Sequence, residues 1–194
     1  NVPVSVDNDV NCAAIGEAHY GAGKEYDNFI CLTYGTGIGG AIVINRQLYR
    51  GSIFSAGEFG HIVTHAGGLE CSCGLRGCYE QYASTTALVK KVMNLDPSFT
   101  SGREIFKHID NIKVQEIVNK WIDEIIIGLA SLTHIFNPEC IILGGGIMNV
   151  PYIIERLNAL FYENIMPSFN NVVLKQAQLG NKSGLFGAAH LAAE

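Results

Sequence analysis

The amino-acid sequence predicts an α/β fold, because segments with strand-like and helix-like patterns alternate along its 194 residues. Two apolar segments, 28–34 and 139–143, have the composition of buried strands, and each runs directly into a glycine-rich turn. Apolar residues from Val114 to Leu132 recur about every 3.6 residues, which predicts a long amphipathic helix that the Asn-Pro pair at 137–138 ends. With 48% hydrophobic and 16% charged residues, the chain is long enough to bury one core.

Local signals place the remaining elements. Alternating residues at 2–6 predict a strand that ends in a polar loop, and small, Ala-rich residues at 11–20 predict a short helix. A helix at 79–93 is expected to break near Ser84. The other expected elements are a returning strand at 41–45, a hairpin edge at 46–50, a polar linker at 96–102, a helix at 151–166 with proline in its first turn, a strand at 172–174 and a helix at 183–193.

Charge and hydropathy argue against two classes of partner. The formal net charge is −5, the isoelectric point is about 5.7 and no basic stripe exists, so we expect no nucleic acid to bind this chain. No apolar run approaches the roughly 18 residues of a membrane span, and no signal-peptide pattern is found, so we expect no membrane contact and a cytoplasmic location. The chain opens at Asn1 without an initiator Met, and we expect it to be one lobe of a larger protein.

The segment 57–80 predicts a metal site. Three cysteines crowd onto a short, glycine-rich loop, and a histidine precedes them, which together form the Cys3His set of a closed structural zinc site. Glu58 and Glu80 flank this loop and are not needed for zinc, so their position suggests a polar binding surface that the metal holds in place. The expected ligands are His61, Cys71, Cys73 and Cys78.

Two alternatives to this metal site remain open. His65 is a rival to His61 as the fourth ligand, and the six cysteines could instead include a disulfide within the loop. The remaining cysteines lie in apolar contexts, where we expect small buried hydrophobic residues; they are Cys12, Cys31 and Cys140.

Both glycine-rich turns, 35–40 and 144–146, are candidates for phosphate binding. Glycine lets the backbone approach an anion and direct N–H groups toward it. Neither turn is a P-loop, because no Gly-Lys-Ser/Thr follows, and the first is no dinucleotide fingerprint, because no helix follows it. The simpler interpretation of each turn is a tight hairpin. Two such turns in one α/β chain favour a nucleotide site.

The polar segment 7–11, Asp-Asn-Asp-Val-Asn, is a second candidate site. It follows the first expected strand, and α/β proteins bind ligands at the carboxyl ends of strands. The alternative is an Asx turn with a helix N-cap, which needs fewer polar residues than this segment offers.

Five motifs follow one another over almost the whole chain. They are Asn8-Asp9-x-Asn11-x-Ala13-Ala14-x-Gly16-Glu17, Gly35-Thr36-Gly37-Ile38-Gly39-Gly40, Gly57-Glu58-x-Gly60-His61, Cys71-x-Cys73-Gly74-x-x-Gly77-Cys78-x-Glu80 and Pro138-Glu139-x-Ile141-x-Leu143-Gly144-Gly145. In order and spacing they resemble the ROK family of bacterial sugar kinases and sugar-responsive repressors. The resemblance implies an actin/hexokinase/Hsp70-like (ribonuclease H-like) fold, with residues 1–194 as a single carboxyl-terminal lobe. The amino-terminal phosphate-binding lobe of these kinases, with its Asp-x-Gly-Gly-Thr turn, is absent from this sequence.

The same resemblance implies a role for each matching residue. Asp9 corresponds to the general base that takes a proton from a sugar hydroxyl, usually at C6, before attack on the γ-phosphate of ATP. His61 would serve both zinc and sugar, one ring nitrogen for each. The implied sugar ligands are Asn8, Glu58, His61 and Glu80; the phosphate turn is Gly35, Thr36, Gly37 and Gly39; the adenosine edge is Gly144, Gly145 and Gly146.

The resemblance leaves three functions to distinguish. The first is an ATP-dependent kinase for a hexose or N-acylhexosamine, with structural zinc and with Mg²⁺ accompanying ATP. The second is the effector-binding domain of a sugar-responsive regulator, which predicts a helix-turn-helix before Asn1. The third is a non-catalytic zinc-dependent interaction module, which predicts that no sugar binds. A homodimer is a further expectation from the family.

Overall fold

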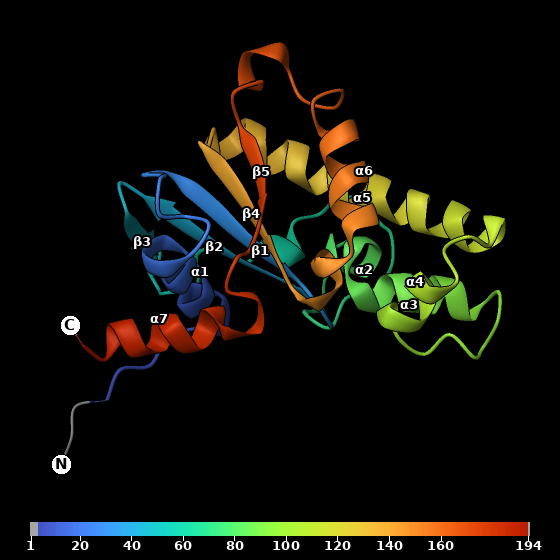
Figure 1. Ribbon diagram of the computed structural model, residues 1–194, viewed down its shortest axis with the longest axis horizontal. Coiled ribbons are helices and arrows are strands. Elements are labelled where there is room, and N and C mark those ends of the chain that lie inside the picture. Colours follow the sequence, from blue (N-terminus) through green and yellow to red (C-terminus); the bar gives the residue numbers. More distant parts are fainter. Residues whose placement is uncertain (1–3, 194) are drawn as a thin grey trace.

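The computed structural model describes residues 4–193, which form one mixed five-stranded sheet with helices on both faces (Figure 1). The strands are β1 Phe29–Tyr34, β2 Ile38–Ile44, β3 Gln47–Tyr49, β4 Cys140–Gly144 and β5 Val173–Gln176. The α-helices are α1 Asp9–Tyr20, α2 Glu80–Ala83, α3 Thr85–Met93, α4 Gly102–Lys107, α5 Ile112–Phe136, α6 Pro151–Phe161 and α7 Ser183–Leu191. Short 3₁₀ helices are η1 Phe59–His61, η2 Gly146–Asn149, η3 Pro167–Phe169 and η4 Gly180–Lys182.

The strand order β3-β2-β1-β4-β5 puts β1 at the centre of the sheet. β1 pairs antiparallel with β2 and parallel with β4, and β4 pairs parallel with β5. In the β1–β4 ladder, Thr33 lies opposite Gly144. The turns that follow β1 and β4 therefore leave the sheet at the same edge.

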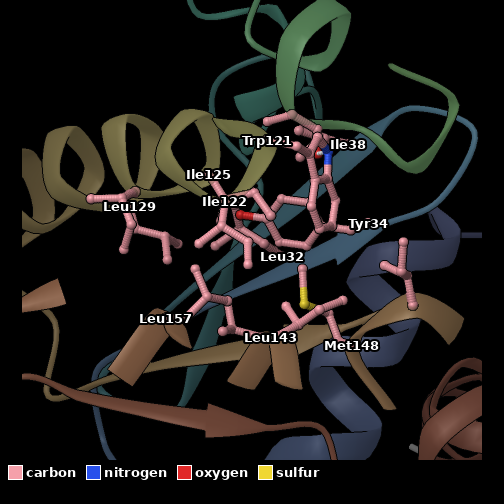
Figure 2. Close-up of a cluster of buried hydrophobic side chains, with 14 of the residues drawn as sticks. Leu32, Tyr34, Ile38, Trp121, Ile122, Ile125, Leu129, Leu143, Met148 and Leu157 are labelled. Atoms are coloured by element: carbon pink, nitrogen blue, oxygen red, sulfur yellow. Dashed lines mark hydrogen bonds between the residues drawn. The ribbon is translucent and has the colours of Figure 1, made fainter. Parts of the chain in front are cut away.

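The central strands are buried on both faces, which explains their nearly continuous apolar sequences. On one face, α1 packs on Phe29 and Cys31 in a core of mostly small side chains, with α7 beside it (Figure 1). On the other face, α5 packs on Leu32 and Tyr34 in a larger core (Figure 2). The amphipathic helix predicted from Val114 is therefore confirmed as the main cover of one face.

Trp121 on α5 links the larger core to the break between α2 and α3. Its ring is fully buried, and Nε1 donates to the backbone oxygens of Ala83 and Ser84, each at 3.0 Å. Ser84 also caps α3, since its Oγ accepts a hydrogen bond from Ala87 N at 3.1 Å. The predicted break near Ser84 is thus confirmed, and α5 holds it in place.

On the opposite face, α1 and α7 pack unusually closely because glycines lie at their crossing. A Cβ on Gly16 would collide with the backbone of Ser183, and one on Gly187 with the backbone of Cys12. The Glu17 carboxylate is fully buried beside this crossing. It accepts hydrogen bonds from Ala22 N, just after α1, and from three donors around the start of α7.

Two predicted elements differ from the structure. Residues 4–8 are not a strand: Val4 and Val6 are 80% and 91% exposed, and no strand of the sheet lies beside them, while residues 2 and 3 fall outside the described part. The helix predicted at 151–166 ends earlier, at Phe161, and Met166 has the extended backbone expected of a residue that precedes proline. Within residues 4–193, no helix combines the length and apolar character needed to cross a bilayer.

Candidate functional site

Four side chains of the segment 57–80 converge into a cluster that could hold a metal ion. His61 Nδ1 lies 3.6 Å from Cys71 Sγ, and Cys73 Sγ lies 3.6 Å from Cys78 Sγ. All four ligand atoms lie within 4.8 Å of one another. Zinc bonded to sulfur at about 2.3 Å and to nitrogen at about 2.0 Å separates tetrahedral ligands by about 3.6–3.8 Å. The side chains therefore fit one tetrahedral ion.

Glycines let the loop fold back on itself around these ligands. Gly74 and Gly77 have φ of +88° and +82°, which other residues adopt only with strain. Cys71 N donates to Leu75 O at 2.9 Å, and Val63 and Cys78 form an isolated β-bridge. The backbone alone thus brings the cysteine side chains to one point.

The structure distinguishes His61 from its alternatives, which were His65 as the fourth ligand and a disulfide within the loop. His65 stacks on Tyr82 with ring centroids 3.8 Å apart, and its Nε2 lies 3.6 Å from Glu124, so it is not one of the four clustered residues. The Cys73–Cys78 sulfur separation is that of two ligands on one ion, since a disulfide needs about 2.0 Å. His61 is the ligand that the structure favours.

Tyr79 anchors the end of this loop in the core. Its ring is fully buried, and its hydroxyl donates to Ile125 O at 2.9 Å and bonds the Tyr34 hydroxyl at 2.9 Å. Burial raises the pKa of both tyrosines, so both remain neutral hydrogen-bonding groups. Gly128 on α5 provides the space for the Tyr79 ring. Because Glu80 is the next residue, the buried Tyr79 fixes the backbone position from which the Glu80 side chain extends.

Glu80 bridges the metal cluster and the turn after β1. Its Oε1 accepts from Cys71 Sγ at 3.2 Å and from Gln81 Nε2 at 3.3 Å, and its side chain is 14% exposed. Its Oε2 lies over Gly37, where a Cβ would come within 2.5 Å of that oxygen. Gly37 therefore leaves the space that the Glu80 carboxylate occupies beside the turn.

Glu58 and His61 lie on the open side of the same cluster. Glu58 Oε2 is 3.9 Å from His61 Nε2, and the Glu58 side chain is 63% exposed. Since Nδ1 of His61 faces the sulfurs, Nε2 is the nitrogen that is directed away from the metal set. Glu58 and His61 can therefore both offer polar atoms to a ligand above the loop.

The two glycine-rich turns meet at the carboxyl edge of the sheet. In the first turn, Gly35 N donates to Gly37 O at 3.0 Å. Gly145, with φ of +97°, lies directly against the backbone of Tyr34, and a side chain there would collide with it. The turns are thus adjacent, as their position after parallel strands predicts.

The start of α1 lies against the same edge. Asn8 is the N-cap, and its Oδ1 accepts from Val10 N at 2.8 Å and Asn11 N at 3.3 Å. Asp9 is exposed in the first turn, and its Oδ1 accepts from Val10 N at 2.9 Å. Val10 packs where a Cβ on Gly39 would lie. Glycine at this position therefore lets the helix that carries Asp9 approach the β1–β2 hairpin.

These segments enclose one cleft with a volume of ≈ 430 Å³. A second cavity of ≈ 570 Å³ adjoins it and extends between α3 and η2, with Val89, Lys90, Met93 and Ile147 among its lining residues. Of the predicted site residues, Gly144 is buried inside β4, and Asn8 lines a neighbouring cavity with Asp7 and Arg50. The predicted site residues that line the cleft are Asp9, Gly35, Thr36, Gly37, Gly39, Glu80, Gly145 and Gly146.

The sequence did not single out Arg50, and it marked its partner Asp7 only as part of the polar segment 7–11. Arg50 Nη2 and Nε lie 2.8 and 3.0 Å from Asp7 Oδ2, and the two residues are 43 positions apart. Burial acts to raise the pKa of Asp7, but hydrogen bonds from Asn11, Arg50 and the Asn8 backbone bring it below its ordinary value. No sequence pattern marks such a long-range pair.

Comparison with known proteins shows that the relatives of this chain include both glucokinases and xylose repressors. The ROK family model matches residues 1–194, and the chain belongs to the ROK family. It is 37% identical to a glucokinase of Streptomyces coelicolor over 100% of this chain and 68% of that protein. It is 33% identical to a xylose repressor of Bacillus spizizenii over 100% of this chain and 51% of the repressor.

Solved structures of ROK family proteins also resemble this chain. A ROK family glucokinase from Streptomyces griseus, in complex with glucose and AMPPNP, superposes with a TM-score of 0.90 at 36% identity, covering 98% of this chain and 68% of that one. A ROK hexokinase from Thermus thermophilus gives 0.88 at 35% identity, covering 96% and 64%. The chain spans between half and about two thirds of the length of these relatives.

Proposed function

We propose that this chain is the sugar- and zinc-binding lobe of an ATP-dependent kinase that phosphorylates a hexose or N-acylhexosamine. The observation that carries the proposal is the single cleft lined by Asp9, by both glycine-rich turns and by Glu80. A kinase needs a proton acceptor, a phosphate cradle and a sugar-binding surface together, and this cleft supplies candidates for all three. The similar glucokinases support the same assignment.

In this mechanism Asp9 is the general base. Its carboxylate accepts the proton of a sugar hydroxyl, at C6 by family resemblance, as the hydroxyl oxygen attacks the γ-phosphorus of ATP and the bond to the β-γ bridging oxygen breaks. Phosphoryl transfer depends mainly on positioning and on charge stabilisation, so a carboxylate at a fixed helix start is suited to this role. Asp9 lies in the first turn of α1, so the helix fixes its position.

The remaining polar side chains orient the sugar. The end of the sugar ring away from Asp9 contacts Glu58, Nε2 of His61 and Glu80. Capping of α1 uses only Oδ1 of Asn8, so its amide Nδ2 can donate to a hydroxyl. Carboxylates accept from neighbouring hydroxyls and so fix the orientation of a ring.

Zinc would be held by His61 and the three clustered cysteines, and it would supply folding free energy to the loop, not a reactive water. Four protein ligands close the coordination shell, and the role of the ion is to fix the side chains of Glu58 and His61. A strong chelator is expected to lower the melting temperature and to weaken sugar binding, with recovery on adding zinc. Metal analysis that finds no zinc in carefully prepared protein would refute this part.

ATP would lie with its phosphates on the turn at 35–37 and along Gly145 and Gly146. Backbone N–H groups there can bind phosphate oxygens, and Mg²⁺ would neutralise part of the phosphate charge. The adjoining cavity, lined in part by apolar Val89, Met93 and Ile147, fits an adenosine group. In this proposal residues 1–194 are one lobe, and a second, amino-terminal phosphate-binding lobe completes the enzyme.

The test is coupled ATP turnover by the full-length protein with a panel of hexoses and N-acylhexosamines. Asp9→Asn is expected to reduce turnover by at least about 10²-fold, the usual contribution of a general base. A melting curve for each variant separates loss of catalysis from loss of folding. Full activity in Asp9→Asn protein would refute the assignment of the base.

The alternative is a sugar-responsive regulator, which the similarity to the xylose repressor favours. It predicts a helix-turn-helix encoded before this segment, sugar binding without ATP turnover, and sugar-dependent DNA binding by the full-length protein. Reading the upstream codons distinguishes the two functions before any assay.

A further inference from the structure

The ion pair between Arg50 and Asp7 connects two parts of the proposed sugar site, and an inference about it rests on that proposed function. Both Arg50 nitrogens, Nη2 at 2.8 Å and Nε at 3.0 Å, contact the same oxygen, Oδ2 of Asp7. The Asp7 side chain is 10% exposed and that of Arg50 is 33% exposed. This geometry is far tighter than that of a surface pair such as Arg46–Asp27, with 3.6 Å and 49% and 66% exposure.

Asp7 uses its other oxygen to shape the start of α1. Oδ1 accepts from Asn8 N at 2.8 Å and from Asn11 Nδ2 at 2.7 Å. Asn11 is buried inside the first turn of the helix, at 4% exposed. Asp7 therefore binds the backbone before Asp9 and the side chain of Asn11 after it, and Arg50 binds Asp7.

Arg50 also begins the segment that leads to Glu58. Its backbone oxygen accepts from Ala56 N at 3.1 Å, which closes the loop between them. Gly51, with φ of +73°, lies beneath Ala56 and permits this closure. The side chain of Arg50 thus binds Asp7 at the start of α1, while its backbone oxygen binds Ala56 in the loop that leads to Glu58.

We propose that Arg50 is a positioning residue that sets the distance between the base Asp9 and the sugar-binding Glu58. A hexose must place its reacting hydroxyl on Asp9 while its other hydroxyls bind the loop, so the two segments need one fixed spacing. The guanidinium also compensates the Asp7 carboxylate, which otherwise lies two residues from Asp9 without a counter-charge. A displacement of about 1 Å in a catalytic group can cost about 10²-fold in rate.

The experiment compares variants of the full-length protein by kcat, by KM for the sugar and by KM for ATP. Arg50→Met is expected to lower kcat by roughly 10- to 100-fold and to raise the sugar KM. The KM for ATP is expected to stay within about twofold, because Arg50 lines a different cavity from the two glycine-rich turns. Arg50→Lys keeps the charge and is expected to recover part of the loss. Arg46→Met, on the same hairpin, is the matched control and is expected to behave as wild type.

A double-mutant cycle distinguishes positioning from a general loss of stability. If Arg50 acts through Asp7, the double variant Asp7→Asn/Arg50→Met is expected to be no more than about twofold slower than the worse single variant. Fully additive losses, or wild-type kcat and sugar KM in Arg50→Met protein, would overturn the inference. Should Arg50→Met fail to fold, Arg50→Lys and Asp7→Asn carry the same comparison. A wild-type protein that turns over no sugar refutes the proposed kinase function instead, which is a separate result.

Discussion

Replacing Glu17 with alanine is expected to destabilise the protein through one buried carboxylate. Its Oε2 accepts from Ala22 N at 2.8 Å and Gln178 N at 3.1 Å, and its Oε1 from Leu179 N at 2.9 Å and Ser183 Oγ at 2.8 Å. The side chain is fully buried. Its bond from Ala22 N is buried and those from Gln178 N and Leu179 N are part-buried, so water replaces the lost acceptor only in part.

The size of the effect follows from the donors that Glu17→Ala leaves unpaired. Ser183 Oγ also donates to Gly180 O at 2.8 Å and keeps a partner, which leaves three backbone N–H groups. Each unpaired buried donor costs about 1–3 kcal/mol, and a water entering the new space recovers part, so we expect a loss of about 3–5 kcal/mol. For a chain of this size that lowers the melting temperature by roughly 10 °C.

Denaturant and thermal unfolding of the full-length protein measure this loss. Glu17→Gln keeps the volume and one acceptor oxygen, so its destabilisation is expected to be smaller. Glu25→Ala, at an exposed position just after α1, is the matched control and is expected to change stability by less than about 0.5 kcal/mol. A Glu17→Ala protein as stable as the Glu25→Ala control would refute the reasoning.

Three further predictions concern other buried groups. Gly128→Ala places a methyl group against the ring of Tyr79, and overpacking of this kind is expected to lower the unfolding free energy by about 1–3 kcal/mol; unchanged chemical denaturation would contradict it. The Asp7 carboxyl has a pKa below its ordinary 3.8 in the folded protein, so its stabilisation is complete above that pH and is lost as pH falls through the folded value. The stability difference between wild type and Asp7→Asn is therefore expected to be constant near neutral pH and to shrink in acid. A difference that grows in acid would contradict the prediction. Burial raises the pKa of the Cys31 and Cys140 thiols to about 12, so mass spectrometry is expected to find neither alkylated by iodoacetamide in native protein at pH 8; rapid labelling of either would show that the core is open.

Local patterns in the sequence predicted much of the fold and the clustering of His61 with three cysteines. The spacing of Cys71, Cys73 and Cys78 is local information, and the turn glycines lie directly after their strands. The choice of His61 over His65 was not local, because it depends on Tyr82 and Glu124, which draw His65 away from the cluster.

Contacts between distant parts of the chain escaped the sequence reasoning. Arg50 and Asp7 are 43 positions apart, and Glu17 and Ser183 are 166 apart, so no periodicity or motif couples them. The expected strand at 2–6 is not formed over its described residues, 4–6, for a related reason: alternation predicts a strand only where a neighbouring strand exists to pair with it. Polar side chains that shape the site through long-range bonds are visible only in the folded chain.

The central claim is that one cleft brings a sugar hydroxyl, the base Asp9 and the phosphates of ATP together. The most direct measurement is sugar-dependent ATP turnover by full-length wild-type and Asp9→Asn protein, with sugar affinity determined by calorimetric titration on the same samples. We expect turnover to fall by at least about 10²-fold while the sugar dissociation constant changes only a few-fold, because the base acts mainly in the transition state. Sugar-dependent turnover that persists in Asp9→Asn protein, or its absence from wild type with every sugar tested, would contradict the claim.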